Sequence, residues 1–299
     1  MKKTLLGIAI GLACSWGIAY AAGFQSLNQI TTALTGGYGE QKLFVKNGAT
    51  VTAGTFFSLW RVGGIPVAGA DPTSLTATVV SATTTGALYF QNALNGTGKT
   101  KHIINAGATS VTAGSTGSLV ILDRLMAYGN INANVNTAQN MTNTAVLTRY
   151  QTGTGTVMFL EVTTGLGATP SNATITYTNQ DGIAGRTTGA QAMVISSVAN
   201  RIPNTFLYFP LQAGDNGVRS VQTVQLSAAM GAGVMNLVIA KPLFTIPLAL
   251  VGIQNNVDLA LAFPLLPKLE NNHALQMIFF APTASTLPIF VGQINAAEN

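Results

Sequence analysis

The chain has 299 residues, of which 47% are hydrophobic and only 8% are charged. An ordinary soluble domain carries about 25% charged residues, and that charge keeps solitary proteins apart in solution. The formal net charge of +5 includes Lys2 and Lys3, and no later run of basic residues supplies the stripe that a nucleic-acid-binding protein needs. The composition excludes that class and indicates permanent contact with copies of this chain or with a larger assembly.

Residues 1–21 have the pattern of a secretory leader. Two lysines precede an apolar stretch at Leu5–Ile18, and Ala19-Tyr20-Ala21 forms a small-x-small cleavage site. This predicts a mature start near Ala22; an N-terminal arm that is kept and docks on a neighbour is the alternative. Cys14 is the only cysteine, so cleavage would leave neither a disulfide nor a thiolate site.

A short helix is expected first. Its apolar face would be Phe24, Leu27, Thr31 and Leu34, with Ser26 as the N-cap.

Strand patterns dominate after residue 34. Apolar residues alternate with threonine at Leu75–Val79 and at Asn172–Thr178, which is typical of strands with one buried face. Thr156–Val162 and Leu275–Phe280 are denser apolar runs that predict central strands. Turn signals punctuate the chain at Asn47-Gly48, Asn95-Gly96, Asp181-Gly182 and Asn216-Gly217.

These patterns predict an all-β, antiparallel fold, sandwich or jelly-roll-like, with one short N-terminal helix. The segment Gly48–Gly54 is echoed at Gly107–Gly114, so duplicated β units and merely similar threonine-rich hairpins both stay open. The Asn- and Ala-rich stretch 130–143 indicates a boundary or exposed loop. We therefore expect a leader or arm at 1–21 and two packed β-rich domains at 22–150 and 151–299.

The stretch Ala93–Thr100 ends in Gly-Lys-Thr, like a phosphate-binding loop. Such a loop must open a helix whose amides hold the phosphate. The following Lys101–Ala108 is instead typical of a strand and turn, which favours a hairpin tip. Leu243–Ile253 is apolar but too short to span a bilayer. It predicts a buried core segment, and we expect no membrane span after residue 21.

Catalytic signals are sparse. His102 and His273 stand far apart without carboxylates at ligand spacing, and we expect both at a solvent edge or in turns. A glycoside hydrolase would need two of the nine carboxylates to converge at about 5–10 Å. We expect no enzyme, no catalytic residues, no cofactor or metal, and no small-molecule substrate.

From Thr174 onward the order of motifs resembles a family of tailed-bacteriophage virion proteins. The matching segments are Tyr177–Arg186, Phe209–Val221, Leu226–Ala229, Lys241–Leu243, Ile246–Leu248 and Leu265–Leu269. A weaker match extends through Val51–Gly54 and Lys101–Asn105. The resemblance implies a β-rich structural component of the particle, capsid-associated or of decoration type. An export leader departs from it, because phage head proteins assemble in the cytoplasm.

Within the resemblance, the turn residues at 181–186 and 214–219 would set hairpin geometry. Asp181, Arg186, Asp215 and Arg219 are candidate subunit-contact or turn residues, with Asp215 and Arg219 pairing locally or across a contact. The expected partners are copies of this chain and other virion proteins, and the expected location is the virion. The alternative is a secreted bacterial surface protein, structural or adhesin-like, in the periplasm or outside the cell.

Overall fold

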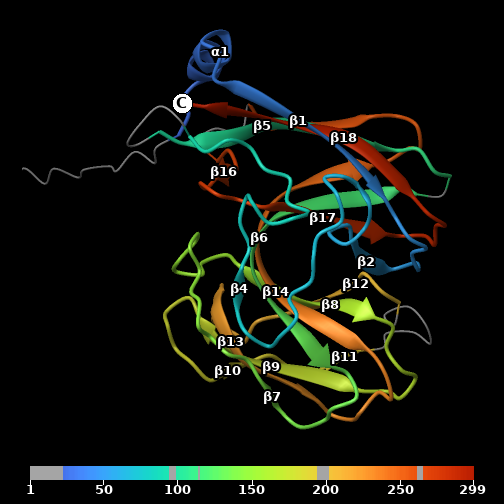
Figure 1. Cartoon of the computed structure of the whole chain (residues 1–299). Helices are drawn as coiled ribbons and strands as arrows, with labels where there is room; N and C mark the ends of the chain where they lie inside the picture. Colours follow the sequence, from blue (N-terminus) through green and yellow to red (C-terminus); the bar gives the residue numbers. More distant parts are fainter. Residues whose placement is uncertain (1–22, 94–98, 114, 194–201, 261–264) are drawn as a thin grey trace, which may run out of the picture.

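The computed structural model describes residues 23–93, 99–113, 115–193, 202–260 and 265–299 (Figure 1). Within these ranges the chain forms one helix and eighteen strands, and every pairing between named strands is antiparallel. The prediction of an all-β antiparallel fold with one short helix is confirmed. The predicted leader at 1–21 and the Asn95-Gly96 turn lie outside the described residues.

Helix α1 spans Leu27–Thr35, and Ser26 caps it by accepting a hydrogen bond from the Gln29 N–H. The predicted helix and cap are confirmed, but of the predicted apolar face only Phe24, which precedes the helix, is buried. Ile30 and Ala33 are buried, whereas Leu27 and Leu34 are 48% and 45% exposed. The sheet beneath α1 selects which side is covered, and the spacing of apolar residues does not contain that information.

The first sheet has six strands in the order β15-β5-β18-β1-β3, with β16 also paired to β5. Their bounds are β1 Gly39–Asn47, β3 Gly64–Ile65, β5 Lys101–Ser110, β15 Asn255–Asp258, β16 Lys268–Leu269 and β18 Ile289–Glu298. Helix α1 lies over one end of this sheet (Figure 1).

The second sheet has seven strands in the order β14-β8-β12-β2-β17-β6-β4. Their bounds are β2 Thr55–Ser58, β4 Thr78–Val79, β6 Gly117–Asn132, β8 Val157–Thr164, β12 Thr205–Phe209, β14 Val234–Leu248 and β17 Leu275–Ala281. Strand β14 also pairs with β6, so six of these strands close into a ring, which we call the barrel. Closure removes two sheet edges that would otherwise be open to unwanted pairing.

The third sheet has five strands in the order β10-β9-β13-β7, with β11 also paired to β9. Their bounds are β7 Gln139–Asn140, β9 Asn172–Asn179, β10 Arg186–Thr187, β11 Gln191–Ala192 and β13 Val218–Leu226. Burial alternates strictly along β9, as the threonine pattern predicts. The long strands β6 and β14 run from the first sheet toward the third (Figure 1).

Two large hydrophobic clusters flank the barrel. One lies between the barrel and the first sheet and includes Phe44, Phe279 and Phe290; the other lies between the barrel and the third sheet and includes Leu160 and Tyr177. Each cluster draws residues from both sides of residue 150, because β6 and β14 contribute to both. The expected division near residue 150 is therefore not the boundary between these clusters.

The other predicted segments are mostly strands. Those at 156–162 and 275–280 are β8 and β17, and 243–253 is the end of β14 followed by a turn. That last segment is only partly buried: Ile246 and Leu248 face a core, while Leu250 and Ile253 are more than half exposed. The expectation of a buried core segment holds for the strand and is wrong for the turn.

Candidate functional site

Most charged residues of the described chain are partly or fully buried. The described residues include twenty charged side chains, and only four belong to exposed residues: Lys99, Asp181, Asp258 and Lys268. Seven others are buried: Lys46, Lys101, Asp123, Arg124, Arg149, Glu161 and Glu298. The surface is therefore even poorer in charge than the composition suggests.

The barrel encloses an ion pair. Arg124 Nη2 of β6 lies 3.0 Å from Glu161 Oε2 of β8, with both side chains 1% exposed or less. Arg124 also donates to Gln276 Oε1, and its guanidinium lies 4.8 Å from the centre of the Trp60 ring. Gln276 in turn donates to Ser58 Oγ at 2.8 Å. Glu161 and Gln276 thus pair with the two terminal nitrogens of the guanidinium, whereas Arg124 Nε is buried without a hydrogen-bond partner.

A second buried pair fastens a loop to the barrel. Arg149 donates twice to the Asp123 carboxylate, at 3.0 and 2.8 Å, and once to the Val80 carbonyl. The Ala274 N–H also donates to Asp123. Two-point guanidinium–carboxylate contacts of this kind fix orientation as well as charge. Both residues are saturated by the fold, which gives them a structural role.

The side of the first sheet that faces away from the barrel is nearly uncharged. Side chains alternate across a strand, and residues opposite one another on paired strands share a face. Val45 lies between Ile65 and Val291 in the register, and Leu43 lies beside Gln293. The part not covered by α1, here called the outer face, comprises Gln41, Leu43, Val45, Ile65, Asn105, Gly107, Thr109, Asn256, Asp258, Ile289, Val291, Gln293 and Asn295.

Aliphatic and amide side chains make up this outer face. Leu43 and Ile65 are 63% and 62% exposed. Gln41 Nε2 donates to Gln293 Oε1 at 2.9 Å, and Asn295 Nδ2 donates to Asn105 Oδ1. Of its described residues, only Asp258 at one margin is charged. The amides satisfy one another across the strands, so the face carries polarity without ions.

The charged side chains of β1 lie on the opposite side of the sheet from the outer face. Glu40, Lys42 and Lys46 occupy the alternate positions of the strand, behind the outer face. Glu40 accepts from Lys42 and Lys101 at 2.9 and 2.8 Å. Lys46 Nζ donates to the carbonyls of Val62 and Pro66, and burial lowers the pKa of Lys46 to about 8.

The predicted contact residues Arg186 and Asp215 meet at one end of the third sheet. Asp215 accepts from Arg186 Nε at 2.9 Å, from the Tyr177 hydroxyl at 2.7 Å and from Asn179 Nδ2 at 2.8 Å. The hydrogen bond from Arg186 lowers the pKa of Asp215 to about 2. The suggested local pairing of Asp215 with Arg219 is wrong, because Arg186 on β10 reaches the carboxylate instead.

The other two predicted residues serve the neighbouring turn. Arg219 donates to the carbonyls of Gln180 and Thr152, which ties β13 to the turn after β9. Asp181 is in that turn and accepts from Gln180 Nε2 at 2.7 Å. All four residues thus have partners within the chain, and their role in subunit contact stays a prediction.

Both histidines are buried, so the expectation of solvent-edge histidines is wrong. His102 lies against Phe24, with Thr100 Oγ1 2.8 Å from its Nε2. His273 follows a turn but is 1% exposed. Its Nε2 accepts the Phe90 N–H at 2.9 Å, and its Nδ1 lies 2.8 Å from the Glu270 carbonyl. The neutral ring protonated at Nδ1 satisfies both contacts.

Acid is expected to weaken the fold through His273. Burial lowers the pKa of His273 below its ordinary value of 6.5. As the pH falls below 6.5, the unfolded chain takes up this proton before the folded one, so stability decreases with the pH. Urea unfolding measured from neutral to mildly acidic pH checks this. In His273→Asn that part of the pH dependence should disappear; an unchanged slope would contradict the assignment.

The motif at Ala93–Thr100 does not open a helix. Residues 94–98 lie outside the described residues, but β5 begins directly at Lys101. A strand offers no N-terminal array of free amides, so the phosphate-loop interpretation fails on geometry. In the described ranges, no group of three His, Cys, Asp or Glu side chains is placed to hold a metal ion. No helix among the described residues is long and apolar enough to cross a membrane.

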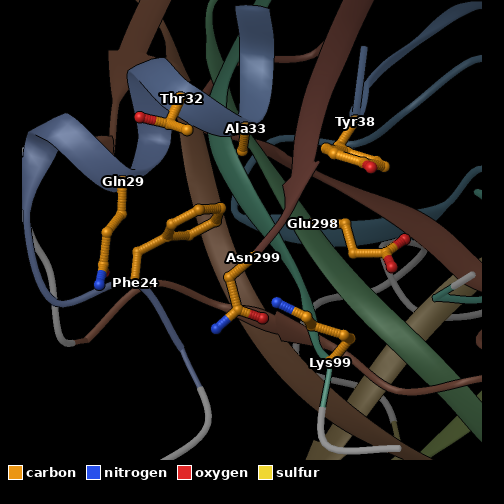
Figure 2. A pocket seen from close by; sticks show the side chains of 8 residues that line it. All are labelled: Phe24, Gln29, Thr32, Ala33, Tyr38, Lys99, Glu298 and Asn299. Atoms are coloured by element: carbon orange, nitrogen blue, oxygen red, sulfur yellow. The ribbon is translucent and has the colours of Figure 1, made fainter. Parts of the chain in front are cut away.

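Figure 2 shows a cavity of about 560 Å³ between α1 and the end of β18. Phe24 and Tyr38 supply its rings, and Lys99 and Glu298 supply one charge of each sign. A second cavity, of about 200 Å³, opens at the mouth of the barrel, and its lining includes Phe56, Phe206 and Tyr208.

None of the five described cavities is lined by two carboxylates. Asp71 lines one of about 260 Å³, and burial raises the pKa of Asp71. Its oxygens are held by Arg61 at 2.8 Å and Asn236 at 2.7 Å. Glu161, whose charge also acts on Asp71, is fully buried against Arg124. In these five cavities the described residues do not bring together two carboxylates, which a glycoside hydrolase needs.

No family model matches the chain, and no curated protein matches it. Three weak matches among solved structures are particles or strains of infectious bursal disease virus. Its VP2 subviral particle aligns over 86% of this chain and 80% of its own, at 11% identity and a TM-score of 0.19. The structure of T=1 particles derived from that virus aligns over 87% of this chain and 77% of its own, at 9% sequence identity and a TM-score of 0.19. The structure of the Gx strain aligns over 88% of this chain and 82% of its own, at 10% sequence identity and a TM-score of 0.16. Likenesses of this strength establish neither a fold nor a function.

Proposed function

We propose that this chain is a non-enzymatic structural subunit of a virion, which acts by burying its low-charge surface against copies of itself. The outer face carries this proposal. Aliphatic side chains favour leaving water, and amides that already pair across the strands lose less than ions would, because each buried unpaired ion opposes association strongly. Because most of the described charged residues are partly or fully buried, much of the described surface is also poor in charge.

The motif order from Thr174 onward supports the finer assignment to a tailed bacteriophage, as a capsid-associated or decoration-type protein. Several of those motifs meet at one end of the third sheet, where Arg186, Asp215 and Tyr177 are linked by hydrogen bonds. These hydrogen bonds fix the end of the third sheet, as is expected of a structural component that keeps its shape in a particle.

The alternative is a secreted surface protein with a functional leader, which shares the low charge and the β structure. Mass spectrometry of purified particles and of the periplasmic fraction separates the two. Peptides of this chain in the particle band, with residues 1–21 present, are the expected result. Peptides confined to the periplasmic or surface fraction, beginning near Ala22, would overturn the virion proposal and favour the alternative.

A further inference from the structure

We propose that the outer face is the contact between two copies of this chain, related by a two-fold axis that places each α1 over the uncovered strands of the other. This inference rests on the proposed function and names the surface through which it acts.

Helix α1 covers only one end of the first sheet. Ile30 and Ala33 pack on Ala297 of β18 and Ile104 of β5. A Cβ placed on Gly39 would lie 2.8 Å from Leu34 Cδ2, so the helix sits directly above the start of β1. The same side of the sheet, farther along β1, is bare. The intramolecular packing shows that this side buries apolar partners.

The exposed side of α1 is uncharged, and it carries Asn28, Gln29 and three threonines beside two leucines. Leu27 and Leu34 are 48% and 45% exposed. At the opposite end of the sheet, Ile65, Val291 and Ile289 are 62%, 38% and 36% exposed. Both ends therefore present aliphatic side chains, with the amides of the outer face between them. A partner surface of the same composition would match both ends.

Shape selects the arrangement. A helix rises about 10 Å above the sheet that it covers. Two copies that met with their helices over the same end would collide. A two-fold axis in the plane of contact and perpendicular to β1 puts the helices at opposite ends, where each fills the recess above the uncovered strands of the other copy. This self-complementarity is the property of an isologous interface and points to a second copy as the occupant.

The size also fits. About six uncovered residues in each of β1, β5 and β18, with the short strands β15 and β3 beside them, give a flat area near 380 Å² at a strand spacing of about 4.8 Å. The outer side of a nine-residue helix adds about 140 Å². Side-chain relief raises the accessible area above this flat value. A standard interface takes about 800 Å² from each partner, so the surface is of the right order for a stable contact.

The test is Leu43→Lys against Val146→Lys. Both residues are exposed aliphatics, at 63% and 77%, but Val146 lies in the loop between β7 and β8. A two-fold contact would bury two new lysines, so Leu43→Lys should weaken self-association on the order of 100-fold. Sedimentation velocity of the full chain measures this, and Val146→Lys should assemble like the parent. Equal assembly of the two variants would overturn the interface.

Cross-linking tests the two-fold arrangement without adding charge. In a Cys14→Ser background, a mixture of Leu34→Cys and Ile65→Cys chains should form a disulfide between copies. A mixture of Leu34→Cys and Val146→Cys should not. A failure of the first mixture, or equal linking in both, would contradict the placement of α1. A parent chain that is monomeric at all concentrations would instead overturn the proposed function itself.

Discussion

Replacing Glu161 with alanine is expected to lower the free energy of unfolding by about 3–5 kcal/mol. The change leaves the Arg124 guanidinium buried in the barrel without its carboxylate, 3.0 Å away in the intact protein. Gln276 and the Trp60 ring remain beside it but cannot neutralise it. Urea unfolding followed by the fluorescence of Trp60, which is 2% exposed, measures the loss.

Two variants give this prediction its controls. Glu270→Ala removes a partly exposed ion pair with Lys268, and its effect should stay below about 1 kcal/mol. The double variant Arg124→Met/Glu161→Leu removes both buried charges and should recover most of the lost stability. A small loss in Glu161→Ala, equal to that in Glu270→Ala, would show that the barrel does not depend on its ion pair.

Phe279→Ala is expected to lower the free energy of unfolding by about 3–5 kcal/mol as well, because it opens a cavity. Phe279 of β17 is fully buried, and its ring centre lies 4.6 Å from that of Phe290 of β18. This contact joins the barrel to the first sheet, so its loss should also loosen the support of the outer face.

Chemical denaturation and sedimentation of the same variant measure the two effects. Phe279→Leu keeps more of the buried volume and should lose less stability and assemble better. If Phe279→Ala were as stable as the parent, the cluster between the barrel and the first sheet would not be a tightly packed core.

The fold class was predictable because period-two alternation and turn residues are local signals. The strand at 172–178 and the Ser26 cap follow from short stretches of sequence, and the structure confirms both. The covered face of α1 and the burial of His102 and His273 were not predictable. Both depend on which elements pack against these residues, and those elements are distant in sequence.

The candidate site was missed for a related reason. The alternation in β1 places Glu40, Lys42 and Lys46 on one side and Gln41, Leu43 and Val45 on the other, which is visible in the sequence. An apolar side normally indicates a core, and here the charged side is the one that faces inward. Only the pairing with β18 and β5 shows that the uncharged side is left exposed. The partner of Asp215 was likewise set by the approach of β10, which brings Arg186 to it.

In the proposed function, an uncharged surface holds copies of this chain together. Sedimentation velocity of the purified chain at about 50 mM and about 1 M salt tests it most directly, since salt at the higher value screens charges beyond about 3 Å. We predict an oligomer of the same size and stability at both concentrations. Dissociation on raising the salt, or a monomer under both conditions, would contradict the claim.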